Sequence, residues 1–140
     1  MAKFEIFRSN INSLYYFSLV TDLGQQILSS EGFLSPNGCL QAITAVKARA
    51  SFRNAYQRIE NNGYFRFDML SDNLQVIASS SASYATLQGL ETAIDTLKTE
   101  APEAPVYEYT PQGYQILSTL PKGLAALLFI QAFSFLFSLT

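Results

Sequence analysis

The sequence predicts an α+β protein of two tandem β-β-β-α repeats that form one pseudo-twofold assembly. The main observation is that a segment from Tyr15 to Lys47 recurs, with substitutions, from Tyr64 to Lys98. Within each copy, apolar residues first alternate as in a strand and then recur at the spacing of an amphipathic helix. At 140 residues and 49% apolar composition, the chain is long enough for one compact domain but too short for two large ones.

The two copies match position by position. The first set of matches is Phe17 with Phe67, Leu19 with Met69, Asp22 with Asp72, Gln25 with Gln75, Ile27 with Ile77, and Ser29 and Ser30 with Ser79 and Ser80. One extra residue after Ser80 shifts the register. The matches then resume with Phe33 and Tyr84, Ser35 and Thr86, Gly38 and Gly89, Ala42 and Ala93, Ile43 and Ile94, Val46 and Leu97, and Lys47 and Lys98.

Three strands are predicted in each repeat. A β-prone run at Phe4–Phe7 comes first, and a polar turn follows it. The next strand places Tyr15, Phe17 and Leu19 on one face, and its copy places Phe65, Phe67 and Met69 inward. A third strand is expected at 26–29 and at 76–79. Between the second and third strands, Asp22 with Gly24 and Asp72 with Asn73 predict turns in which Asp or Asn bonds its own backbone and tolerates left-handed φ.

A capped helix follows the third strand of each repeat. Ser35 and Thr86 stand at the expected N-caps, and Pro36 occupies the first helical position, where its missing N–H does no harm. Both helices are expected to end at lysine, which suits the negative end of the helix dipole. The predicted buried stripes are Cys39, Ala42, Ile43 and Val46 in the first helix, and Leu90, Ala93, Ile94 and Leu97 in the second.

The chain after the second helix is less regular. Thr99–Pro105 is predicted to be a linker, and Val106–Leu117 either a strand that closes the sheet or the stub of a third repeat. The predicted division is a first repeat at 1–51, a second repeat at 52–101, a linker with strand or third-repeat stub at 102–121, and an apolar C-terminal tail at 122–140.

The tail leaves two alternatives open. Residues 123–140 carry no charge, and as a helix these 18 residues would measure ~27 Å, just short of the ~30 Å hydrocarbon core of a membrane. One hypothesis is a C-terminal membrane anchor, and the other is a packed or irregular tail. Because the first ten residues show no secretory signal, the expected location is the cytoplasm, with membrane contact through residues 123–140 under the anchor hypothesis.

The amino-acid composition disfavours several classes of function. The net charge is −2 and only 14% of residues are charged, so the basic surface that nucleic-acid binding requires is not expected. The absence of histidine removes the usual general base and the commonest transition-metal ligand. No cofactor and no metal are predicted.

Candidate reactive groups are few. Asp22 and Asp72 could be imagined as an acid and base pair, but Asp in a hairpin turn is ordinary backbone chemistry. The serines at 29, 30 and 79–81 lack a nucleophile elbow and a histidine to activate them. Cys39 lies on the helix stripe where its counterpart is Leu90, which predicts a core position. No catalytic, cofactor-binding or metal-binding residue is therefore assigned.

The repeated form resembles the YegP-like family, a tandem-repeat domain of unknown function. The resemblance rests on Ile27–Ser30 with Phe33 and Ser35, and on Ile77–Ser80 with Tyr84 and Thr86, and it covers about residues 3 to 100. It implies one sheet in which the strand after each helix is exchanged into the neighbouring half, at 56–59 and at 107–109. The family implies no activity and no catalytic residues.

These observations favour a non-enzymatic binding or interaction module that contacts a protein or a small ligand through its sheet or edges. The alternative is an enzyme with an uncommon carboxylate or hydroxyl site at the repeat interface. Asp22, Asp72 or the serine pairs clustered in a cleft would favour the enzyme. A further hypothesis is a homo-oligomer formed by edge-strand pairing.

Overall fold

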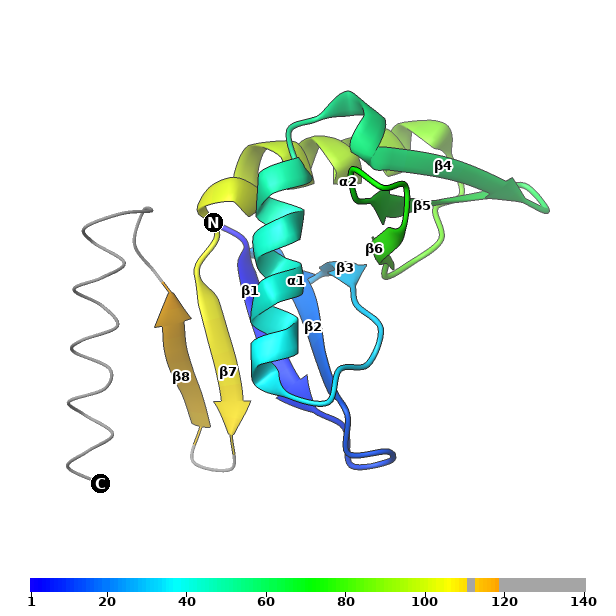
Figure 1. Ribbon diagram of the computed structural model, residues 1–140. Helices are drawn as coiled ribbons and strands as arrows, with labels where there is room; N and C mark the ends of the chain where they lie inside the picture. The colour runs from blue at the N-terminus through cyan, green and yellow to red at the C-terminus, as the bar shows by residue number, and fades with distance from the viewer. Residues whose placement is uncertain (111–112, 119–140) are drawn as a thin grey trace, which may run out of the picture.

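One mixed sheet of eight strands and two helices make up the α+β fold (Figure 1). The computed structural model describes residues 1–110 and 113–118. The first repeat forms β1 (Lys3–Arg8), β2 (Tyr15–Val20), β3 (Gln26–Ser29) and α1 (Pro36–Arg49). The second forms β4 (Tyr56–Asn61), β5 (Tyr64–Leu70), β6 (Val76–Ser80) and α2 (Leu87–Glu100). The last two strands are β7 (Val106–Thr110) and β8 (Gly113–Ser118), and two short 3-10 turns are η1 (Arg53–Ala55) and η2 (Ala101–Glu103).

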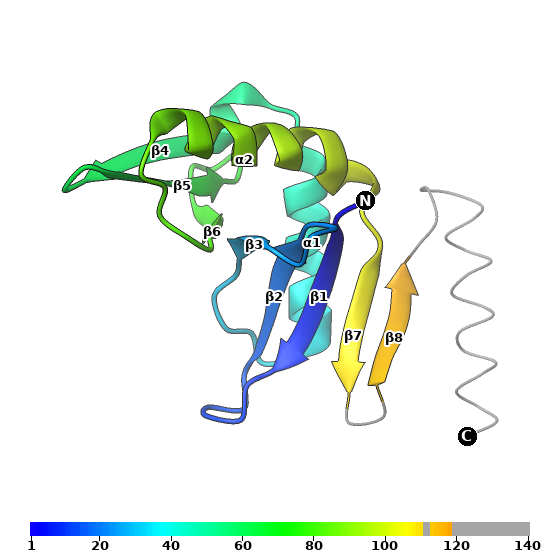
Figure 2. The ribbon, with the colours of Figure 1, turned by 180° about the vertical axis from the view of Figure 1, so that it is seen from behind.

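The two repeats join at the centre of the sheet, whose strand order is β4-β5-β6-β3-β2-β1-β7-β8. There β3 and β6 pair antiparallel, with Leu28 opposite Ser80 and Ser29 opposite Ser79. Figures 1 and 2 show α1 along the β1–β2 half and α2 along the β4–β5 half. The prediction of two repeats in one pseudo-twofold assembly is confirmed.

The strand after each helix lies in the other half of the sheet, as the family resemblance implied. β4 follows α1 and pairs with β5 of the second repeat. β7 follows α2 and returns to the first half, where it pairs parallel to β1 with Val106 opposite Phe4. Each half of the sheet therefore contains the strand that follows the helix of the other half.

The same aromatic packing occurs in both halves of the core. In the first half, the rings of Phe4 and Phe17 pack edge to face, with their centroids 5.9 Å apart. In the second half, the rings of Tyr56 and Phe67 pack in the same way, with their centroids 5.8 Å apart. A lysine from the last turn of the adjacent helix covers the first ring of each pair, Lys47 over Phe4 and Lys98 over Tyr56. The internal repeat in the sequence thus specifies a repeated core, which burial of apolar surface stabilises.

Both helices begin and pack as predicted. The Ser35 and Thr86 side chains accept hydrogen bonds from the backbone N–H groups of Gly38 and Gly89. The predicted stripes face the core, with Ala42 only partly buried and the other members buried. The predicted linker at 99–105 is wrong in its first half, because Thr99 and Glu100 belong to α2 and η2 continues the turn. Pro102 lies at the start of that 3-10 turn, where a backbone N–H is not needed.

The region after α2 forms a β-hairpin at the edge of the sheet. β7 and β8 pair antiparallel from Val106 opposite Ser118 to Thr110 opposite Gly113. The predicted boundaries of the four chain segments stay a prediction. The tail at 122–140, with its anchor hypothesis, lies outside the described residues. In the part of the chain that the structure describes, no helix is both long and apolar enough to cross a membrane.

Candidate functional site

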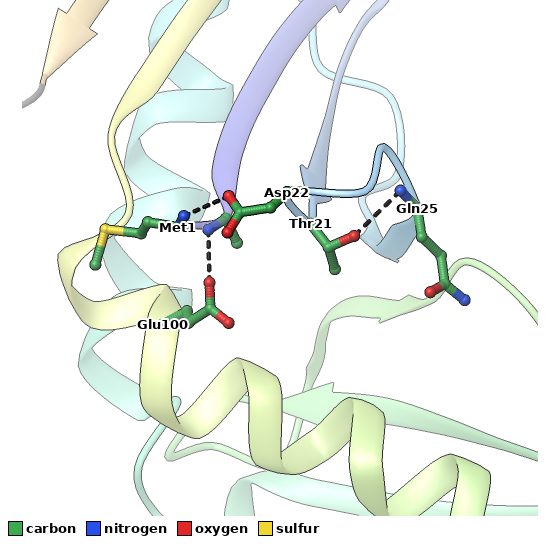
Figure 3. Close-up of polar contacts among 6 residues, drawn as sticks. Met1, Thr21, Asp22, Gln25 and Glu100 are labelled. Atoms are coloured by element: carbon green, nitrogen blue, oxygen red, sulfur yellow. Dashed lines mark hydrogen bonds and ion pairs between the residues drawn. The ribbon is translucent and has the colours of Figure 1, made fainter.

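The two repeated aspartates lie far apart in the sheet. Asp22 precedes β3 and Asp72 precedes β6, and these two strands run in opposite directions where they pair. Their preceding turns therefore lie at opposite ends of the strand pair. Asp22 is exposed and bonds the amino group of Met1 (Figure 3), and Asp72 is exposed on its own turn. The arrangement brings no acid and base pair together at these positions.

Hydroxyl groups, rather than aspartates, stabilise the two turns. The Thr21 side chain accepts a hydrogen bond from the Gln25 N–H at 3.2 Å (Figure 3), and Ser71 does the same for Gln75 at 3.3 Å. The residues with left-handed φ are Gly24 at 82° and Leu74 at 64°. The prediction that Asp22 and Asp72 bond their own backbone is wrong, and so is the prediction of left-handed φ at Asp72 and Asn73. The hydroxyl one position earlier bonds the backbone, and this leaves the aspartate side chain on the surface.

The serine runs do come together, at the pseudo-twofold centre. The Ser29 and Ser81 hydroxyls share a hydrogen bond of 2.5 Å, and Ser79 donates to Asp68 Oδ1 at 2.7 Å. The Ser30 and Ser80 hydroxyls accept from the backbone N–H groups of Phe17 and Phe67, at 2.8 and 3.2 Å. Each of these hydroxyls thus has a partner that holds strands together, which is the strand-edge role expected from the sequence.

A cleft opens beside this centre because the two halves diverge on one side only. On the closed side, the Ser81 N–H donates to the Ile27 carbonyl at 3.4 Å. The equivalent positions on the other side are Glu31 and Ile77, and no hydrogen bond joins them in the described structure. The resulting cleft has a volume of about 300 Å³ and is lined by Ser29, Ser30, Glu31, Val76, Ile77, Ala78 and Ser79.

Sequence reasoning did not identify this cleft. The available signal was the extra residue after Ser80, which breaks the match between the repeats. In the second repeat Ser81, Ala82 and Ser83 lead to Tyr84, whereas only Glu31 and Gly32 lead to Phe33 in the first. The longer connection brings Ser81 back across β3, and its shorter counterpart leaves the gap at Glu31.

Cys39 is a buried core residue, as predicted. Burial, and to a smaller extent the negative charge of Glu108, raise the pKa of its thiol to about 11. At neutral pH the thiol is therefore protonated and a poor nucleophile. Burial also raises the pKa of Glu108, which lies on β7 opposite Ile6 of β1. Among residues 1–110 and 113–118, no three His, Cys, Asp or Glu residues are grouped so that they could hold a metal ion.

Comparison with known proteins gives a consistent result. Residues 12–55 and 60–108 match the domain of unknown function DUF1508. The UPF0339 protein in the ptx operon 5′ region of Stutzerimonas stutzeri is 34% identical over 106 residues, which cover 75% of this chain and 94% of that protein. The UPF0339 protein YegP of Escherichia coli K12 is 32% identical over 108 residues, or 76% of this chain and 96% of that protein.

Solved structures show the same fold. The solution structure of YegP from E. coli, a protein of unknown function, superimposes with a TM-score of 0.71 at 30% identity and covers 79% of this chain and 94% of that chain. The UPF0339 protein SO3888 from Shewanella oneidensis gives a TM-score of 0.71 at 21% identity, over 78% of this chain and 92% of that chain. The chain belongs to the DUF1508 family of YegP-like proteins, whose members named here are uncharacterised.

Proposed function

We propose that the protein is a non-enzymatic binding module, and that the cleft between β3 and β6 receives a small polar ligand with amide-like donors and acceptors. The supporting observation is the one-sided divergence of the two halves, which leaves the backbone of Glu31 and Ile77 without the bond that Ser81 and Ile27 make. About 300 Å³ is at the lower end of the volumes of small-molecule sites.

The lining suits hydrogen bonding with some apolar contact. Ser29, Ser30 and Ser79 contribute hydroxyls, and Val76 and Ile77 contribute apolar surface. Among the described residues of the lining, Glu31 alone has an ionisable side chain. The serine hydroxyls already serve strand pairing, so they are better placed to accept a ligand's hydrogen bond than to attack a substrate.

A fragment screen by ¹⁵N NMR tests this proposal with two matched variants. Val76 borders the cleft and is 51% exposed, whereas Gln26 occupies the same place in the first repeat on the closed side. Amide fragments should shift the signals of 29–31 and 76–79, and Val76→Trp should abolish these shifts by filling the cleft. Gln26→Trp should leave them intact. Shifts that survive Val76→Trp, or that cluster elsewhere, would contradict the proposal.

Two observations favour the enzyme alternative with a hydroxyl site at the repeat interface. The serines at 29, 30 and 79 are clustered in the cleft, which is the arrangement expected of such an enzyme. Ser79 donates to the Asp68 carboxylate at 2.7 Å, but Arg66 also donates to the same oxygen at 3.1 Å and competes for it. A fluorophosphonate probe separates the two functions: covalent labelling that Ser79→Ala removes would favour the enzyme. A protein that stays unlabelled would favour the binding module.

The proposed partners include no nucleic acid, which the net charge of −2 disfavours. Edge-strand pairing between copies and a membrane tether through residues 123–140 are separate proposals. Light scattering at increasing concentration tests the first, and cell fractionation with and without residues 123–140 tests the second. A protein that stays a monomer at every concentration would exclude edge-strand pairing. A full-length protein found wholly in the soluble fraction would exclude the membrane tether.

A further inference from the structure

A second hollow lies at the tip of the β4–β5 hairpin, away from the β3–β6 cleft. It has a volume of about 550 Å³ and is lined by Asn61, Asn62, Tyr64, Arg66 and Ser83. Each of these five side chains can donate a hydrogen bond, and among them Arg66 alone is charged. We infer that this hollow binds an oxyanion, a carboxylate or a phosphate, carried on a small flat organic group.

The hairpin places the donors on one face. Tyr64 and Arg66 are two residues apart on β5, so they share the face opposite Phe67, whose side chain is buried in the core. Asn61 is the β4 partner of Tyr64. Asn62 and Gly63 form the tight turn with φ of 54° and 81°. The short turn thus fixes both amide side chains beside the tyrosine.

The fifth lining residue comes from the connection after β6. Phe65 and Tyr84 exchange two backbone hydrogen bonds of 2.7 Å, which hold this connection along β5. Ser83 therefore lies next to Arg66. This connection is the one that carries the extra residue of the second repeat.

The Arg66 side chain is anchored by one ion pair and still has donors available to a ligand. Its Nη1 donates to Asp68 Oδ1 at 3.1 Å, and Ser79 donates to the same carboxylate oxygen. In the described part of the chain its side chain makes no other hydrogen bond, and 46% of that side chain is exposed. A guanidinium has five donors in a planar fork, so one arm can be anchored while another pair binds an oxyanion.

The equivalent position of the first repeat is filled, so the shared fold does not by itself create the hollow. The residues equivalent to Tyr64 and Arg66 are Leu14 and Tyr16, and they pack against Gly32 in the shorter connection. A Cβ atom on Gly32 would lie 2.6 Å from a methyl carbon of Leu14, so no space remains there. The Tyr16 ring stacks on Phe7, and its hydroxyl accepts from Asn12. The first repeat fills the position with the Leu14 and Tyr16 side chains, and the second opens it and lines it with donors.

The size of the hollow indicates more than a free ion. A volume of about 550 Å³ exceeds what an inorganic oxyanion occupies, and Tyr64 is 56% exposed beside Arg66. An aromatic or other flat group could lie on this ring while its acidic group reaches the guanidinium.

An NMR titration of the full-length protein with benzoate, phenyl phosphate, inorganic phosphate and neutral benzyl alcohol tests the inference. The amides of 61–66 and Ser83 should shift with the first two compounds, and far less with the alcohol. The stronger of the two anions identifies the preferred acid group. Arg66→Gln should weaken binding about tenfold or more. Arg53→Gln, on an exposed arginine of η1, should have no effect.

A second variant tests whether any loss of binding in Arg66→Gln comes from the hollow and not from a change in the fold. Ser83→Glu keeps the guanidinium but adds a negative charge to the lining, and it should also abolish binding. Equal shifts with benzyl alcohol, binding unchanged in Arg66→Gln, or binding unchanged in Ser83→Glu would each overturn the inference.

Discussion

The Tyr84 hydroxyl is buried, and it finds no hydrogen-bond partner in the described part of the protein. The first repeat has Phe33 at the equivalent place. Because a buried polar group without a partner costs free energy, Tyr84→Phe should raise the free energy of unfolding by about 1 kcal/mol. Phe33→Tyr, the matched reverse change, should lower it. Urea denaturation of both variants measures the effect, and a destabilised Tyr84→Phe would show that the hydroxyl is bonded after all.

The same residue links stability to alkaline pH. Burial raises the pKa of Tyr84 above its ordinary value, so the folded state holds the proton more tightly than the unfolded state. Below about pH 10 the hydroxyl is protonated in both states, and its titration leaves the unfolding free energy unchanged. As pH rises from there through the folded-state pKa, the unfolded state loses its proton first and the unfolding free energy falls. Tyr84→Phe should therefore reduce the decline of stability above pH 10.

Leu74 is strained because it adopts φ of 64°, where the first repeat has Gly24. Left-handed backbone costs a leucine about 1–2 kcal/mol, and glycine offsets part of the gain through its greater freedom in the unfolded chain. Leu74→Gly should therefore stabilise the protein by about 0.5 kcal/mol. Leu23→Gly, in the turn of the first repeat but without positive φ, should instead destabilise it. Melting temperatures of the two variants decide this, and a shift in the same direction for both would contradict the strain argument.

At the scale of single residues, the sequence predicted positions better than contacts. Cys39 was predicted to be buried, because a helix stripe depends only on spacing. The turn residues were predicted wrongly, because aspartate, threonine and serine can all bond a nearby N–H, and the backbone path decides which one does. The hollow at Arg66 was not predicted, since its lining includes Ser83 from a different strand connection.

At the scale of elements, the N-caps provide a direct comparison. The Thr86 Oγ1 accepts from the Gly89 N–H at 3.0 Å at the start of α2. Thr86→Ala removes this bond and should lower the free energy of unfolding by about 1 kcal/mol. Thr92→Ala lies inside α2, where the Thr92 hydroxyl bonds the Gln88 carbonyl, and should be neutral or slightly stabilising because alanine favours helix. Thermal unfolding followed by circular dichroism measures both, and equal effects would exclude the capping role.

Elements were predictable where a local rule applied. The second and third strands and both helices follow from alternation, periodicity and caps that lie within one segment. The pairing of those elements does not, because β7 joins β1 across most of the chain. That exchange was anticipated only through the resemblance to the family. The closing hairpin was left open between two alternatives, because the sequence after Leu117 lacks the repeated turn and cap.

At the scale of the whole molecule, the two halves share one core but differ where ligands could bind. The repeat predicts symmetric features, such as the paired aromatics of the core. Both candidate sites arise from departures from symmetry, at Glu31 beside the β3–β6 gap and at Ser83 beside Arg66. Both places lie in the connections that differ in length by the one residue inserted after Ser80, and the consequences of this insertion depend on backbone paths that composition and periodicity do not specify.

The shared core also predicts how the protein unfolds. β3 pairs with β6, and α1 contacts β6 and η2 of the second half, so neither half is complete alone. Ile43 and Ile94 are equivalent buried residues of α1 and α2. Ile43→Val and Ile94→Val should each lower the stability of one common transition by about 1 kcal/mol. The dependence of the unfolding free energy on urea concentration should stay unchanged, because the same surface becomes exposed. Two separate transitions, each sensitive to only one of the variants, would show that the halves unfold independently and that mutual burial does not hold the assembly together.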